Sequence, residues 1–236
     1  MLLPFRGLAC RKLQVDELWA FCYAKQKNVA KAKAAPPDAG DLWTWVAIDA
    51  DTKLVPSWLV GRRDGEAAKL FIADLASRLA NRVQLTSDGH IAYLEAVYGA
   101  FRSTGIDYAQ LVKIYGPAPE PAGRYSPAEC VGATKQRVAG NPDPKHISTS
   151  YAERVNLTIR MNTRRLTRLT NAFTKKAENH AHAIALHFMY YNFCRIHASL
   201  RCTPAMAAGV TGRLWDVVDV VRVIESWERD QEKAAA

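Results

Sequence analysis

The sequence lacks the segments that mark membrane-spanning, secreted and zinc-binding proteins. No run of about 18 apolar residues occurs, so no membrane span is predicted. The start of the chain is too short for a secretory signal peptide and has none of its parts. The five cysteines are scattered and include no C-x-x-C pair, which supports neither a zinc site nor a disulfide framework. A reduced, cytoplasmic protein is the simplest interpretation.

Acidic residues are few relative to basic ones. The 236 residues include 32 Lys and Arg against 23 Asp and Glu, a formal net charge of +9. An excess of this size favours a polyanionic partner, nucleic acid above all. An anionic membrane surface is less favoured, because no strongly amphipathic basic segment lies beside an apolar anchor. The absence of a G-x-G-x-x-G motif argues against a dinucleotide-binding fold.

The order of the predicted elements indicates a mixed α/β protein. Strands are predicted over residues 12–23, 42–49, 54–60, 83–86 and 108–115, with helices from Asp64 to Leu79 and over residues 91–102. Pro56 places the third strand at an edge or a bulge. Residues 116–148 are rich in Pro, Gly and Asn and are predicted to form a long loop. We therefore expect a five-stranded sheet flanked by helices, with three antiparallel strands followed by parallel ones.

The second half of the chain is predicted to be helical. Helices are expected from Ser150 to about Leu169 and from Lys176 to Cys194, with a short one at Thr203-Pro204 and a last one from Trp215 to about Arg229. We divide the chain into a core over residues 1–174, with the loop at 116–148 as an insertion, and a C-terminal helical extension over residues 175–236 that packs on the core.

Asp88 lies where the fourth strand ends. Residues 83–90, Val-Gln-Leu-Thr-Ser-Asp-Gly-His, read as a buried strand that ends in a carboxylate with a glycine turn behind it. Open α/β sheets bind their ligands at the carboxyl ends of their strands. A turn aspartate is the alternative, because Asp-Gly is a common turn pair. For this stretch alone the turn is the better interpretation.

Two other carboxylates are expected to approach Asp88. The first strand lies mid-sheet with the fourth parallel beside it, so Asp16 and Asp88 project from adjacent strands. Glu153 lies near the start of the helix that follows the long loop. Three carboxylates suit two Mg²⁺ or Mn²⁺ ions, and without metal their repulsion raises at least one pKa. Glu17 is a rival to Asp16, and Glu153 alternatively favours only its helix dipole.

The helix after Glu153 carries a basic surface. Its predicted DNA-binding residues are Arg154, Arg160, Arg164, Arg165, Arg168, Lys175 and Lys176. Arg160 lies seven residues after Glu153, two turns along the same face, where a cation could hold a phosphate near the metal ions. A solvated basic face is the alternative, although the acids of the usual i, i+4 pairs are nearly absent.

Four blocks in order resemble the DDE transposases of bacterial insertion sequences, most closely the IS1-like family. They are Val15-Asp16-Glu17-Leu18-Trp19, the hairpin from Trp43 to Val55, Thr86-Ser87-Asp88-Gly89, and Tyr151-Ala152-Glu153-Arg154-Val155-Asn156. The segment from Tyr191 to Ala205 resembles the tail that follows integrase-type cores. The resemblance spans residues 12 to about 210.

The resemblance implies an RNase H-like fold and a metal-binding triad of Asp16, Asp88 and Glu153. It implies a nucleoid-associated transposase that cleaves double-stranded DNA and transfers strands between transposon ends and target. We expect a homodimer or higher oligomer on DNA. Family members usually carry an end-binding region before the first strand, and this chain has no room for one. A truncated, non-catalytic DNA-binding remnant or regulator and a nuclease with the same core are therefore alternatives.

Overall fold

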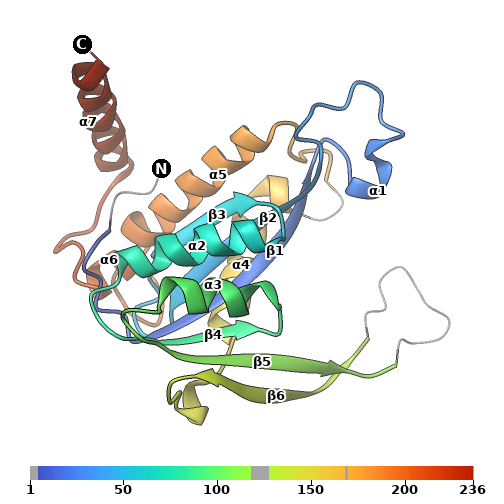
Figure 1. Cartoon of the computed structure of the whole chain (residues 1–236). Coiled ribbons are helices and arrows are strands. Elements are labelled where there is room, and N and C mark those ends of the chain that lie inside the picture. The colour runs from blue at the N-terminus through green and yellow to red at the C-terminus, as the bar shows by residue number, and fades with distance from the viewer. Residues whose placement is uncertain (1–4, 118–127, 168–169, 236) are drawn as a thin grey trace.

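The computed structural model describes residues 5–117, 128–167 and 170–235, and a six-stranded mixed sheet lies at its centre (Figure 1). The strand order is β3-β2-β1-β4-β5-β6. β1 to β3 form an antiparallel meander, β4 is parallel to β1, β5 is parallel to β4, and β6 is antiparallel to β5. The strands are Lys12–Cys22 (β1), Gly40–Asp49 (β2), Ser57–Gly61 (β3), Gln84–Asp88 (β4), Asp107–Tyr115 (β5) and Cys130–Ala139 (β6). The predicted meander and the parallel pairing of the first and fourth strands are confirmed.

The expectation of five strands and of a loop over residues 116–148 is wrong. β6 lies within that range and pairs with β5 along its length, and a 3₁₀ turn (η1, Pro144–His146) follows. Nearly all β6 side chains are exposed on this edge of the sheet. A strand with little buried on either face needs no alternation of apolar and polar residues, so its sequence carries no strand signal.

The predicted third strand begins too early, although its edge position is confirmed. Leu54 and Val55 are buried but precede β3. The side chain of Asn192 takes the place of a neighbouring strand there: its Oδ1 accepts from the Val55 N–H and its Nδ2 donates to the Val55 carbonyl, both at 3.0 Å. A buried peptide group needs such partners wherever no strand provides them.

Helices cover both faces of the sheet (Figure 1). Helices α2 (Gly65–Arg78) and α3 (Ala92–Ala100) pack on one face, and α4 (Ser150–Asn162) and α5 (Ala177–Met189) on the other. β1 is therefore buried on both faces, with Leu13 and Val15 in the first core and Leu18 and Ala20 in the second. This double burial gives β1 the apolar sequence from which it was predicted.

The helices after α4 differ in part from the prediction. α4 ends at Asn162, and a 3₁₀ turn (η2, Arg164–Leu166) follows; Leu169 lies outside the described residues. α5 continues as a π-helical turn (η3, Tyr190–Cys194), and α6 (Pro204–Ala207) begins at the predicted Thr203 cap. α7 (Val217–Ala235) extends away from the sheet, and α1 (Gln26–Val29) is a short helix between β1 and β2 (Figure 1).

Residues after 174 share the cores of the sheet. Ile184 and Phe188 of α5 are buried against β1, β2 and α4, while Phe193 and Ala205 are buried on the other face. The division at residue 174 stays a prediction. No helix in the described part of the chain is long and apolar enough to cross a membrane.

Candidate active site

Neighbouring acids of β1 point to opposite faces of the sheet. Asp16 faces α4, where its Oδ2 accepts a hydrogen bond from Asn156 Nδ2 at 2.9 Å. Glu17 faces α3, where its Oε2 accepts from the Tyr93 hydroxyl at 3.1 Å. The parallel register aligns Gln14 with Thr86, which sets Asp16 beside Asp88 at the end of β4. The predicted juxtaposition of Asp16 and Asp88 is therefore present.

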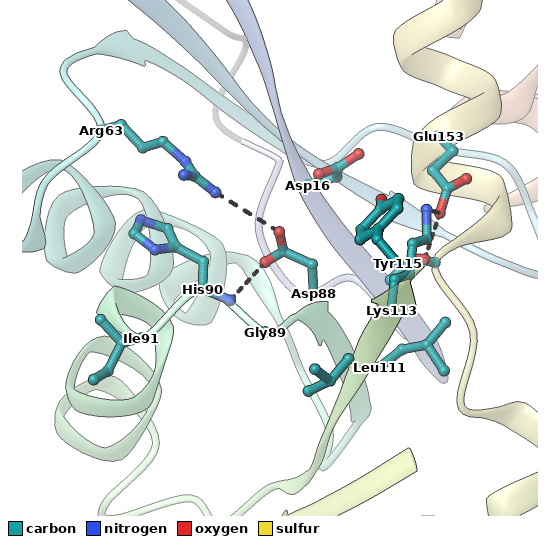
Figure 2. Close-up of a pocket in the computed structure, with 12 residues that line it drawn as sticks. Asp16, Arg63, Asp88, Gly89, His90, Ile91, Leu111, Lys113, Tyr115 and Glu153 are labelled. Carbon is teal, nitrogen blue, oxygen red and sulfur yellow. Dashed lines mark hydrogen bonds and ion pairs between the residues drawn. The ribbon is translucent and has the colours of Figure 1, made fainter. Parts of the chain in front are cut away.

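Three carboxylates meet in the middle of the sheet, at the carboxyl end of β4. One oxygen each from Asp16, Glu17 and Asp88 lies within 4.8 Å of the other two. Asp88 also behaves as the turn aspartate of the alternative interpretation, because its Oδ1 accepts from the His90 N–H at 3.0 Å (Figure 2). A carboxylate has two oxygens, so the turn bond leaves Oδ2 for another partner. A set of clustered carboxylate oxygens suits a hard cation such as Mg²⁺ or Mn²⁺.

The crowding of these acids changes their ionisation. Burial, together with the charges of Asp88 and Glu153, raises the pKa of Asp16 to about 6. Burial, with the charge of Asp88, raises the pKa of Glu17 to about 7, although Arg63 opposes the shift. The predicted effect of repulsion is therefore present at Asp16 and extends to Glu17. A cation at this cluster would relieve the repulsion, so the residues present fit a divalent metal.

Glu153 lines the same cavity from the opposite side. The acidic cavity, as we call this space of about 560 Å³, has Asp16, Asp88 and Glu153 in its walls (Figure 2). Glu153 Oε1 is 2.7 Å from Lys113 Nζ and accepts from Thr149 Oγ1 at 2.6 Å. Burial would raise the pKa of Glu153, but these two contacts outweigh it and lower that pKa. Glu153 is not part of the close cluster of three oxygens.

Gln14 and Asn156 dock α4 against β1. The Oε1 of the buried Gln14 accepts from the backbone N–H groups of Tyr151 at 2.7 Å and Ala152 at 3.2 Å. These are N–H groups of the first turn, which have no partner within the helix. Asn156 Oδ1 is buried and without a hydrogen-bond partner among the described residues, while its Nδ2 holds Asp16. A strand side chain thus sets where the helix that carries Glu153 begins.

Arg63 bridges the carboxylates on the α3 side. Its Nε donates to Glu17 Oε1 at 2.9 Å, and its Nη2 is 3.8 Å from Asp88 Oδ2. Its guanidinium stacks over the Trp43 ring at 4.9 Å. Sequence reasoning missed Arg63, Lys113 and Gln14. A pair of arginines directly before the Asp64 helix cap was the one available signal for Arg63.

His90 forms part of the cavity wall. Its ring stacks on Trp45 with centroids 5.9 Å apart, and its buried Nε2 has no hydrogen-bond partner among the residues described. Burial, together with the charge of Arg63, lowers the pKa of His90. The side chain is therefore a neutral imidazole packed beside the acids at neutral pH.

The predicted DNA-binding residues lie outside the cavity wall. Arg154, Arg164, Lys175 and Lys176 are exposed and Arg165 is half-buried, while Arg168 lies outside the described residues. Arg160 donates to the backbone carbonyls of Trp19 and Leu166, both at 3.3 Å. Those contacts tie β1 to η2. They do not aim Arg160 at the acidic cavity, which its side chain does not line.

The six-stranded mixed sheet and the carboxylates at the end of β4 define a mixed α/β protein. This architecture is compatible with an RNase H-like fold, although the sheet has one strand more than the five predicted. No protein-family model and no curated protein matches the chain.

Solved structures give distant similarities. One is a chain of the simian T-cell lymphotropic virus intasome in complex with PP2A regulatory subunit B56 gamma: 12% identity, TM-score 0.49, covering 92% of this chain and 62% of that one. Two structures of Aquifex aeolicus Argonaute show 9% identity, with TM-scores of 0.32 and 0.31, and cover 60% and 76% of this chain and 24% and 28% of theirs. The chain spans less than two thirds of each. Similarity at this level assigns neither a family nor a reaction.

Proposed function

We propose that this chain is a divalent-metal-dependent enzyme that cuts and joins DNA phosphodiesters, the transposase of an insertion sequence with an RNase H-like core. The observation that carries the proposal is the placement of Asp16, Asp88 and Glu153 around one cavity at the carboxyl end of β4. These residues come from two adjacent strands and a helix more than sixty positions later in the chain. The resemblance of the four sequence blocks supports the narrower assignment to an IS1-like transposase.

The carboxylates have defined roles in this proposal. Asp16 and Asp88 would hold the first Mg²⁺ or Mn²⁺, with Glu17 within reach, and Glu153 would complete the site for a second ion. Bound ions of this kind activate an attacking oxygen and stabilise a leaving one. A water or a 3′-hydroxyl would attack the phosphorus and lose its proton to solvent or a carboxylate. The bond from phosphorus to the leaving 3′ oxygen would break, and that oxygen would take up a proton from solvent to become a 3′-hydroxyl.

The positive charges around the site support DNA as the substrate. Arg63 lines the acidic cavity with its guanidinium over the Trp43 ring, and it would offer a positive charge to a phosphate bound there. Arg154, Arg164, Lys175 and Lys176 give the α4 side an exposed basic surface. Such residues neutralise backbone phosphates, so binding should weaken steeply as salt rises.

One assay tests this function. The wild-type chain, Asp88→Asn and the control Asp51→Asn would be incubated with plasmid and with 3′-hydroxyl duplex ends in Mg²⁺ or Mn²⁺. Asp51 is the matched control because it is an acid in a turn paired with Lys12 at 2.7 Å and does not line the cavity. We expect metal-dependent nicking and joining by the wild type and the control, and neither by Asp88→Asn.

Other outcomes reject the proposal in part or in full. Cleavage without joining would replace the transposase by a nuclease with the same site. DNA binding without any metal-dependent product would leave a non-catalytic DNA-binding remnant. Products that persist in Asp88→Asn would show that the acidic cavity is not the active site.

A further inference from the structure

Glu153 lines the acidic cavity and already forms an ion pair with the side chain of Lys113. Its two side-chain contacts among the described residues, with Lys113 Nζ at 2.7 Å and with Thr149 Oγ1 at 2.6 Å, are made with the same oxygen, Oε1. Asp16, Glu17 and Asp88 bring their oxygens together, and Glu153 does not join them. The carboxylate expected to complete the centre is therefore held by a side chain of the protein itself.

The strand lengths explain how Lys113 reaches this position. β4 ends at Asp88, which is opposite Leu111, whereas β5 continues to Tyr115. Lys113 therefore lies beyond the end of β4, and its partner in the neighbouring strand β6 is the small Ala133. Figure 2 shows Lys113 beside Glu153 on one side of Asp16 and Asp88, and Arg63 on the other.

The two cations of the cavity are held very differently. Arg63 has a 38% exposed side chain but is held by the ring of Trp43 and by Glu17, whose side chain is only 1% exposed. Lys113 has an ion pair with Glu153 alone among the described residues, and the two side chains are 33% and 44% exposed. A lysine is a compact charge on a flexible stem. Lys113 can therefore change partners by giving up one ion pair, whereas Arg63 would have to give up its contacts with both Glu17 and Trp43.

We propose that Lys113 is a built-in competitor for the second cation of the centre, so that Glu153 becomes available only when Lys113 moves to another anion. This inference rests on the proposed function. A backbone phosphate in the cavity would offer Lys113 such an anion, because Lys113 lines that cavity. DNA and the second ion would then each favour the binding of the other, as linkage requires. The complete centre would form only on substrate.

Mn²⁺ titration calorimetry without DNA tests the competition directly. In Lys113→Met the weaker Mn²⁺ site should bind about fivefold more tightly than in the wild type, the upper range for a partly exposed ion pair. Lys113→Arg keeps the charge and should resemble the wild type. Lys69→Met is the matched control, because Lys69 forms an ion pair of the same 2.7 Å with Glu95 away from the cavity. Thermal melting would verify that each variant is folded.

The outcomes separate this inference from the proposed function. Mn²⁺ binding that is lost in Asp88→Asn but unchanged in Lys113→Met overturns the competition and leaves the metal centre in place. An equal gain in Lys69→Met would show a general charge effect and would also overturn it. No Mn²⁺ binding to the wild type would reject both proposals. A gain confined to Lys113→Met, and absent when Glu153→Gln is added, supports the competition.

Discussion

The two sides of the acidic cavity are built on different principles. On the sheet side, Asp16, Glu17 and Asp88 are placed by the register of β1 and β4, and Glu17 and Arg63 form a pair whose acid is almost fully buried. On the helix side, Glu153 and Lys113 form an ion pair with both side chains partly exposed. The sheet side is therefore preorganised and strained by repulsion, whereas the helix side is adjustable. A metal site of this kind would have one ion-binding position already formed on the sheet side and a second that forms only when Glu153 is released.

The largest effect is expected when a carboxylate is removed from the sheet side of the cavity and the loss of metal binding is compared with the same change on the helix side. Asp16→Asn should abolish Mn²⁺ binding and lower metal-dependent cleavage about a thousandfold, or ~4 kcal/mol in activation free energy. Glu153→Gln should keep the first ion and lose the second, because the Asp16–Asp88 pair is intact. Calorimetry with a plasmid-nicking assay measures both. If Glu153→Gln also loses the first ion, the two sides form a single unit and the contrast is wrong.

The second effect concerns how the free energy of unfolding of the metal-free chain depends on pH. Glu17 and Asp16 have folded pKa values of about 7 and about 6, both above their ordinary values. The contribution of each carboxyl to the free energy of unfolding is complete below the pKa that it has in the unfolded chain. That contribution is lost as the pH rises through the pKa that it has in the folded chain. Measured relative to wild type, the stability of Glu17→Gln should therefore rise as the pH goes from about 4.5 to about 7, by an amount on the order of 2 kcal/mol.

Urea unfolding of both proteins across that interval is the measurement. The difference between variant and wild type is the quantity to follow, because the buried His180 and the half-buried His187 have pKa values lowered to about 4 by burial. Those histidines make stability rise with pH in part of the same interval. A difference that does not change with pH would mean that Glu17 is not strained, and saturating Mn²⁺ should reduce the change.

A smaller effect is expected from the attachment of α4. Gln14→Leu removes the acceptor of the Tyr151 and Ala152 N–H groups, which should lower the free energy of unfolding by about 1 kcal/mol. Hydrogen exchange should show faster exchange in the first turn of α4 and little change in β1 and β4. Equal loosening of β4 would show that the sheet side depends on the helix side.

The smallest effects are expected on the outer surface of α4. Arg154→Gln should leave stability almost unchanged and reduce the slope of log K for DNA against log salt by about 1. Arg160→Gln should instead lower the melting temperature, because its guanidinium holds the carbonyls of Trp19 and Leu166. Binding measured at several salt concentrations, beside thermal melting, distinguishes them. A salt slope that changes only in Arg160→Gln would reverse these roles.

The order of elements and the main acidic residues could be predicted because they depend on local signals. β1 and β4 are apolar strands with acids at or near the sheet edge, and parallel pairing follows from the intervening helix. The position of Glu153 follows from the start of α4. β6 could not be predicted, because a strand with exposed side chains is specified by its backbone pairing with β5 and has no periodic pattern of its own.

By itself, the sequence determined which side chains were available: the carboxylates at Asp16, Asp88 and Glu153, the excess of basic residues and the apolar segments that form the central strands. Tertiary structure alone decided their partners. Glu17 faces the opposite side of β1 from Asp16 and still approaches Asp88. Lys113 reaches Glu153 because β5 continues beyond the end of β4. Such contacts join residues far apart in the chain. Their distances depend on register and helix docking, which short-range patterns do not encode.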